Sequence, residues 1–223
     1  MIEEFERPLS LVEATMKGIR SAIIGGNLSL GQILTESYLQ KSFGFSKTPI
    51  REALAQLKAE GLVVSEVHKG FRVFKMDEKE LSEFCEYRLA LESHALKNAY
   101  KNDRLELVRV LKDFIKDFKE SIKENDFNKY NLIDTKFHKS FFILSSNRYL
   151  TKNYENINGI IETIRTHTGP VIVDNYKLID SINGHILIHK HIKAKNLNLA
   201  LEELDKHINS WHDDRIIKSL LIP

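Results

Sequence analysis

Apolar residues recur at the spacing of an α-helix along most of the chain, which predicts a protein that is mainly helical. The first such row lies near the N-terminus and stops at Gly25-Gly26, where a helix is expected to end. Its members are Leu9, Val12, Met16, Ile19 and Ile23. The chain therefore opens with one amphipathic helix.

A second helix is predicted a few residues later. Thr35 is placed to cap it, because a hydroxyl can accept a hydrogen bond from a free N–H of the first turn. Leu39 and Phe43 then face inward, and Gly44 ends the helix.

A third helix follows at once in the segment 46–54, and its apolar row continues to Leu57. Thr48 is a good N-cap. Pro49 suits the first helical turn, because an N–H at that position would have no acceptor within the helix, so its absence costs nothing. Gly61 is placed to end the helix. The face predicted to be buried consists of Ile50, Leu54 and Leu57.

After this helix, residues 62–67 and 71–74 have the composition of two short strands, joined by the turn His68-Lys69-Gly70. The order is helix, helix, tight turn, helix and β-hairpin. This is the order of a winged helix-turn-helix, a fold that binds DNA and also binds proteins.

Beyond residue 75 the pattern is helical almost throughout, and seven of the ten glycines lie before that point. We predict a winged domain over residues 1–75 and an all-helical bundle over 76–223. The stretch 169–175 is predicted to be a connection. The bundle helices are expected near 78–101, 103–124, 127–145, 148–167, 178–194 and 196–220.

Composition agrees with a protein of the cytoplasm and gives no sign of a membrane segment. The 223 residues suffice for two domains, and no apolar run approaches the roughly 20 residues that span a bilayer. The N-terminus is acidic, unlike that of a signal peptide, and the single Cys85 fits a reducing compartment. Up to Lys75 there are ten Lys and Arg against eight Asp and Glu, so the whole net charge of +2 lies at that end.

The start of the third helix carries the residues expected to reach DNA. In a helix-turn-helix the second helix of the pair lies in the major groove, and its first turn meets base edges. Arg51 is suited to guanine or to a phosphate. The polar residues of this turn are Ser46, Lys47, Thr48 and Arg51, and those of the wing are His68, Lys69 and Gly70.

Histidines of the second domain suggest a metal site. Asp134 and His138 are four residues apart, which places them on one helix face, and His185 and His207 also lie beside apolar rows. A carboxylate and three imidazoles can hold one divalent ion. Spacing alone leaves two alternatives open: hydrogen-bonded core histidines, or a rival pair formed by His185 and His189.

Arg88 lies in an apolar row of the first bundle helix and is expected to point into the bundle. Two roles are open for it. It can pair with a buried carboxylate such as Glu92 on the same helix, or its guanidinium can clamp the carboxylate of a small organic acid.

Residues 11–73 resemble the DNA-binding domain of the GntR family. The most specific segment is 46–54, Ser-Lys-Thr-Pro-Ile-Arg-Glu-Ala-Leu. Two positions depart from the family pattern: Lys47 and Ser37 stand where Arg is frequent, and Lys lacks the planar fork of Arg. The resemblance implies DNA contact by Thr35, Ser37, Ser46, Lys47, Thr48, Arg51, His68, Lys69 and Gly70.

Residues 76–220 resemble the FCD ligand-binding domain of the FadR subfamily, through segments 88–92, 134–138, 145–147 and 181–188. The resemblance implies a metal, zinc or nickel, held by Asp134, His138, His185 and His207. It also implies an effector site that includes Arg88 and Asn147. Gly184 departs from the pattern, because a Glu usually precedes the third ligand, and this affects the support of the ligands rather than their number.

Together these features predict a homodimeric transcription regulator on a palindromic operator, controlled by a small carboxylate that binds beside the metal. The resemblance favours a repressor that the ligand releases, whereas the residues alone leave open which state holds DNA. One alternative is an enzyme that uses an Asp/His₃ metal site. Another is a metal sensor, or a structural metal, without an organic effector. A fatty acyl-CoA ligand is disfavoured, because members that bind one generally lack these metal residues.

Overall fold

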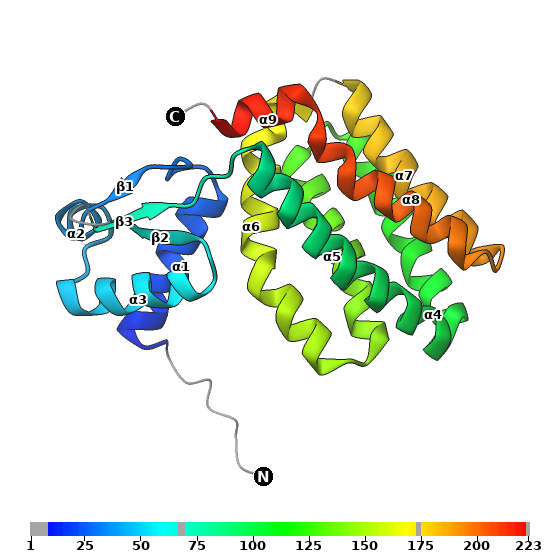
Figure 1. Ribbon diagram of the computed structural model, residues 1–223, viewed down its shortest axis with the longest axis horizontal. Helices are drawn as coiled ribbons and strands as arrows, with labels where there is room; N and C mark the ends of the chain where they lie inside the picture. The colour runs from blue at the N-terminus through cyan, green and yellow to red at the C-terminus, as the bar shows by residue number, and fades with distance from the viewer. Residues whose placement is uncertain (1–8, 67–69, 173–174, 222–223) are drawn as a thin grey trace, which may run out of the picture. The chain divides into compact units, whose positions relative to one another are not determined.

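The computed structural model describes residues 9–66, 70–172 and 175–221, with the side chains of 170–172, 175–177 and 221 left aside. The chain divides into two compact units between Lys75 and Met76, and each is described by itself. The predicted architecture is confirmed: a winged helix-turn-helix with a small sheet precedes a helical unit (Figure 1). No helix of the described residues is both long and apolar enough to cross a membrane.

The first unit begins with α1 (Leu11–Ile24). Its start is fixed by a capping box, in which Ser10 and Glu13 each satisfy a backbone N–H of the other. Ile19 and Ile23 are fully buried against the rest of the unit. The helix packs on α3 and thereby positions it.

Helices α2 (Glu36–Phe43) and α3 (Lys47–Ala59) form the helix-turn-helix. The predicted cap of α2 is confirmed, because the N–H of Tyr38 donates to Thr35 Oγ1 over 3.2 Å. Gly44 ends α2 with φ of +74°, a conformation that suits a residue without Cβ.

The predicted start of α3 is wrong by two residues. Its N-cap is Ser46 rather than Thr48, so Pro49 is the third helical residue. Proline is tolerated there because the first four N–H groups of a helix have no acceptor within it. The predicted end is confirmed: Gly61 has φ of +75°, and the N–H of Leu62 returns to the carbonyl of Leu57 over 3.0 Å.

The sheet has three strands in the order β1-β3-β2, all antiparallel. The predicted hairpin is present as β2 (Val63–Glu66) and β3 (Gly70–Val73), with Val63 opposite Val73. Strand β1 (Ile33–Leu34) pairs with β3 and was not predicted. Two residues are too few to show a period-2 pattern, and only pairing with β3 defines them as a strand.

The second unit consists of helices, coloured from green to red in Figure 1. They are α4 (Glu78–Lys123), α5 (Phe127–Ser145), α6 (Arg148–Ile172), α7 (Asn175–Lys193), α8 (Leu197–Asn209) and α9 (Asp214–Leu221), with a 3₁₀ turn at Ser210–His212. Helix α4 is kinked at Asp103, whose side chain caps the second segment through the N–H of Glu106 over 2.9 Å. The break predicted between the helices 78–101 and 103–124 is therefore confirmed, because Asp103 leaves the helical conformation (φ of −155°, ψ of 89°) and divides α4 into two segments.

Two boundaries differ from the expectation. The single helix predicted over 196–220 is broken at Asp213, which is extended (ψ of 132°) and caps α9 by accepting from the N–H of Arg215. The connection predicted from residue 169 is instead helix as far as Ile172. Gly169 lies against Phe127, where a Cβ would come within 2.5 Å of the ring. This glycine permits close packing and does not break the helix.

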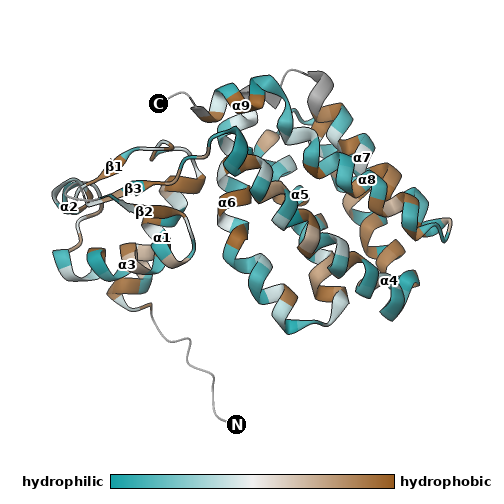
Figure 2. Ribbon diagram, in the orientation of Figure 1, coloured by the Kyte–Doolittle hydropathy of each residue, from teal (hydrophilic) through white to brown (hydrophobic). Residues whose placement is uncertain are grey.

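The core of the helical unit lies where α5 packs on α4 and α6, and where α7 packs on α4 and α8. Figure 2 shows hydrophobic and hydrophilic residues alternating along these helices, as amphipathic helices require. Aromatic rings fill the centre, with Phe118, Phe137 and Phe141 fully buried. His138 of α5 and His185 of α7 stand beside these rings.

Candidate DNA-binding helix and metal centre

Helix α3 separates its buried and polar faces as predicted. Ile50, Leu54 and Leu57 are completely buried. The residues predicted to contact DNA, Ser46, Lys47, Thr48 and Arg51, are all exposed. Thr35 and Ser37, at the start of α2, are exposed as well, and their hydroxyl oxygens lie 3.2 Å apart.

Arg51 has a partner that was not predicted. Its Nε donates to the carboxylate of Glu36, the first residue of α2. The hydrogen bond from Arg51 lowers the pKa of Glu36, so the carboxylate stays ionised beside the guanidinium. Among the described residues Glu36 is the partner found for this side chain, through Nε, so the outer edge of the guanidinium, Nη1 and Nη2, faces away from that contact.

Of the predicted wing residues, Gly70 is described and begins β3 with φ of +91°, exposed to solvent. His68 and Lys69 lie outside the described residues.

In the helical unit, four predicted residues come together from three helices. Asp134 and His138 stand on α5, His185 on α7 and His207 on α8, and their ligand atoms all lie within 4.8 Å of one another. Nε2 of His138 is 3.2 Å from Nε2 of both His185 and His207. Nε2 of His185 is 3.2 Å from Oδ1 of Asp134. Sequence spacing placed only the first two side by side.

These separations fit a single ion. Ligands at tetrahedral positions around a metal, with bonds of about 2.05 Å, stand about 3.3 Å apart. Nδ1 of His138 lies 2.6 Å from the carboxylate of Glu92, which fixes the proton on Nδ1 and turns the Nε2 lone pair toward the cluster. Burial lowers the pKa of His185 to about 4 and that of His207 well below its ordinary value, so both rings are neutral. Neutral imidazole is the form that binds a metal.

The rival pair is not supported by this geometry. His189 lies one turn beyond His185 on α7 and is half-buried. Among the described residues it is not part of the group that could hold an ion.

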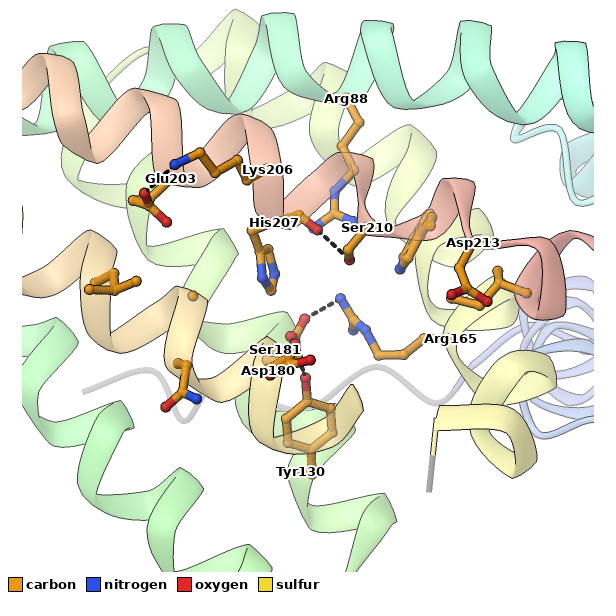
Figure 3. Close-up of a pocket in the computed structure, with 16 residues that line it drawn as sticks. Arg88, Tyr130, Arg165, Asp180, Ser181, Glu203, Lys206, His207, Ser210 and Asp213 are labelled. Carbon is orange, nitrogen blue, oxygen red and sulfur yellow. Dashed lines mark hydrogen bonds and ion pairs between the residues drawn. The ribbon is translucent and has the colours of Figure 1, made fainter. Parts of the chain in front are cut away.

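Beside the cluster is a cavity of about 410 Å³ (Figure 3). Of the two roles left open for Arg88, the structure shows the pairing with Glu92. Its Nε donates to Glu92 over 2.6 Å, and its Nη2 is buried in the cavity wall without a hydrogen-bond partner among the described residues. The guanidinium lies 4.8 Å above the ring of Trp211, which holds it in place. A buried guanidinium nitrogen without an acceptor is the feature expected of an anion site.

Arg165 is a cavity residue that the sequence analysis missed. It comes from α6 and forms an ion pair with Asp134, and its Nη1 also donates to Thr135 over 2.8 Å. Tyr130 donates to Asp134 over 3.3 Å. The sequence did contain a signal for the burial of Arg165, since this residue follows the buried Ile164 on the apolar face of its helix.

Asn147, predicted to bind the effector, is not among the residues that line the cavity. Its side-chain oxygen accepts from the N–H groups of Tyr149 and Leu150, at 3.1 and 3.2 Å. Asn147 thus stabilises the start of α6.

Gly184 leaves room for the His207 ring. A Cβ at residue 184 would lie 3.0 Å from Nδ1 of His207. Gly184→Ala is therefore expected to displace the ring and to weaken zinc binding about tenfold, the lower end of the range for lost ligand support. Competition with a chromophoric chelator measures this. Gly159→Ala, also within a helix but outside the cluster, is the control and is expected to leave the affinity unchanged.

The buried histidines also predict a pH dependence for the metal-free protein. Burial lowers the pKa of His185 from 6.5 to about 4, so the folded state binds fewer protons than the unfolded chain. Stability is then full above pH 6.5 and falls as the pH drops through 6.5 toward 4. Urea midpoints at several pH values measure this, with His185→Phe as the variant. An equally steep loss in the variant would contradict the prediction.

Comparison with known proteins adds a decisive observation. Residues 11–73 match the model of bacterial regulatory proteins of the gntR family, and residues 83–210 match the FCD domain. The chain belongs to the GntR family. This regulator is 30% identical to the probable D-xylose utilization operon transcriptional repressor of Paenarthrobacter nicotinovorans, over 85% of this chain and 81% of the relative.

Two further comparisons support the assignment to the GntR family. It is 26% identical to the gluconate operon transcriptional repressor of Bacillus subtilis, over 87% of this chain and 81% of the relative. The solved structure of McbR/YncC from E. coli has the same fold, with a TM-score of 0.73 over 91% of this chain and 95% of that chain, at 19% identity. The family and its relatives indicate a DNA-binding transcription regulator rather than an enzyme.

Proposed function

We propose that this GntR regulator represses transcription by binding a palindromic operator as a homodimer, and that a small carboxylate bound beside a divalent metal controls this binding. The observation that carries the proposal is the unpartnered Nη2 of Arg88, which lies in the same cavity wall as the histidine cluster. An anion site next to a candidate cation site suits a ligand that carries a carboxylate.

Asp134, His138, His185 and His207 would hold the metal. Three imidazole nitrogens and one carboxylate oxygen suit zinc or nickel better than magnesium or calcium, which prefer oxygen. When bound, the ion would offer a positive charge to the ligand. The Glu92 carboxylate links both halves of the site, since it accepts from Arg88 and from His138, each over 2.6 Å.

On DNA, the exposed first turn of α3 would enter the major groove, with Lys47, Thr48 and Arg51 toward the bases and phosphates. Thr35 and Ser37 would meet the backbone from α2, and the wing would meet it from the other side. Twofold symmetry of the dimer would match that of the operator.

The ion pair between Arg51 and Glu36 yields a testable consequence. The Glu36→Gln substitution is expected to lower the preference for one base pair about fivefold, because the fork of Arg51 is no longer held. Affinity for random DNA is expected to rise, since a negative charge near the phosphates is removed. Fluorescence anisotropy on matched duplexes measures both. Glu52→Gln, an exposed residue of α3, controls for charge and should keep the base preference.

Selection of bound duplexes from a random DNA pool, at near-physiological salt and with zinc-loaded protein, tests the proposal. Enrichment of one palindrome that is lost in Arg51→Ala is expected. If folded, zinc-loaded protein enriches no sequence, operator recognition is contradicted. If chelation alone releases the operator and no carboxylate acts, the protein is a metal sensor instead.

A further inference from the structure

We propose that Arg165 keeps one oxygen of Asp134 from the metal, and that tight metal binding therefore depends on an anion in the cavity. The inference rests on the proposed function and concerns the regulation of the same site. It is carried by the contacts of the Asp134 carboxylate and by the balance of buried charge around it.

Both oxygens of Asp134 border the histidine cluster. Oδ1 lies 3.2 Å from Nε2 of His185, and Oδ2 lies 3.8 Å from Nε2 of His138. A carboxylate can bind a metal through one oxygen or through both. Either mode is within reach of Asp134, so the other partners of its two oxygens decide between them.

The guanidinium of Arg165 engages Oδ2. Its Nη2 forms an ion pair with this oxygen, and its Nη1 donates to Oγ1 of Thr135 over 2.8 Å and to the carbonyl of Asn131 over 3.5 Å. These partners all stand on α5, and the Arg165 side chain, which points into the cavity, is 5% exposed (Figure 3). A planar, permanently charged group held through both terminal nitrogens does not release the carboxylate easily. Asp134 is thus left with Oδ1 for the metal.

The buried charges balance before a metal is bound. Among the described residues, the buried side chains of the types Arg, Lys, Asp and Glu are Arg88, Arg165, Glu92 and Asp134. Their two positive and two negative charges add to zero. A divalent metal would add two positive charges, and no further buried carboxylate of the described residues offsets them. An uncompensated buried charge is strongly unfavourable, so the affinity for the metal is held down until an anion joins it.

The cavity wall offers the anion a place beside the cluster. Arg88, Arg165 and His207 all line it, so an anion there would lie near the metal and near both guanidiniums. Its negative charge would offset the positive charge of the metal. By linkage, the anion raises the affinity for the metal by the same factor by which the metal raises the affinity for the anion. Arg165 is therefore a positioning residue that acts on the metal through Asp134.

Zinc competition with a chromophoric chelator, on the full chain with and without acetate at constant ionic strength, tests the inference. In Arg165→Met both oxygens of Asp134 are released and one positive charge is gone, so zinc is expected to bind at least about tenfold more tightly. The gain in zinc affinity from acetate, several-fold in the wild type, should shrink in this variant. A residue that only supports a ligand predicts the opposite sign, since its loss weakens metal binding about 10- to 100-fold.

Three further variants separate the role of Arg165 from a loss of folding. Arg165→Lys keeps a cation beside Oδ2 and should retain the wild-type affinity for zinc. Thr135→Val removes one bond that holds the guanidinium and leaves all charges in place, so a smaller gain in zinc affinity is expected. Arg148→Met, at the exposed start of α6, is the control and should match the wild type.

The outcomes separate this inference from the proposed function. If Arg165→Met and Thr135→Val bind zinc more weakly than the wild type, Arg165 only supports Asp134, so the inference is overturned and the metal site stands. If acetate leaves the affinity of the wild type for zinc unchanged, the dependence on an anion is overturned. If the folded wild type binds no zinc, the metal site of the proposed function fails as well.

Discussion

Replacing His185 with alanine is expected to weaken zinc binding by at least about 100-fold. The loss of a supporting residue alone weakens metal sites about 10- to 100-fold, and His185 is a direct ligand in the proposed site. Its Nε2 lies 3.2 Å from both His138 Nε2 and Asp134 Oδ1, so no other described side chain fills its place. Zinc at 100 times its dissociation constant stabilises a folded protein by about 2.7 kcal/mol, and the variant should lose most of this gain.

Thermal unfolding with and without zinc measures the effect, and chelator competition gives the affinity. His189→Ala, one helical turn away on α7 and half-buried, is the matched control and should keep the zinc-dependent shift. Equal shifts in wild type and His185→Ala would contradict the four-residue site. Because the metal-free variants are compared as well, simple destabilisation by the cavity is measured separately.

Arg51→Ala is expected to lower specific operator affinity by about 5- to 150-fold, the range for one bidentate contact with guanine (about 1–3 kcal/mol). The side chain is 66% exposed, so the substitution should hardly affect folding. Arg51→Lys separates charge from geometry. Lysine keeps the attraction to phosphates and lacks the planar fork, so affinity for random DNA should stay while base preference is lost.

Competition binding with the operator and its single-base variants measures this preference at each position. If Arg51→Lys kept the full preference, Arg51 would contact phosphate only. An Arg51→Ala variant that bound the operator normally would remove α3 from base recognition altogether.

The elements that could be predicted from the sequence are those whose signals are local. Helical spacing and the glycines at 44 and 61 defined α1 to α3, because a cap or a positive φ is decided by a few neighbouring residues. Strand β1 was not predicted, since its two residues are a strand only through pairing with β3. The helical conformation of Gly169 was not predicted either, because the packing of this glycine against Phe127 is a tertiary contact without a local sequence signal.

The residues of the candidate site also divide into those with a local signal in the sequence and those that only the tertiary structure brings together. The i, i+4 spacing put Asp134 and His138 on one face of α5. His185 and His207 were candidates because they lie beside apolar rows, and the resemblance to the FCD domain selected them over the alternatives. Arg165 was missed although it contacts Asp134 directly, because the two residues are far apart in sequence. The contact of Glu36 with Arg51 likewise depends on how α2 is placed against α3.

Regulation by a ligand is tested most directly by the affinity of zinc-loaded protein for its selected operator, measured by fluorescence anisotropy with and without a small carboxylate that calorimetry has shown to bind. At least a fivefold weakening by the saturating carboxylate is expected, absent in Arg88→Ala and in metal-free protein. Calorimetry should also find that the operator weakens carboxylate binding by the same factor. Operator affinity that is the same with and without the bound carboxylate would contradict the control of DNA binding by this site.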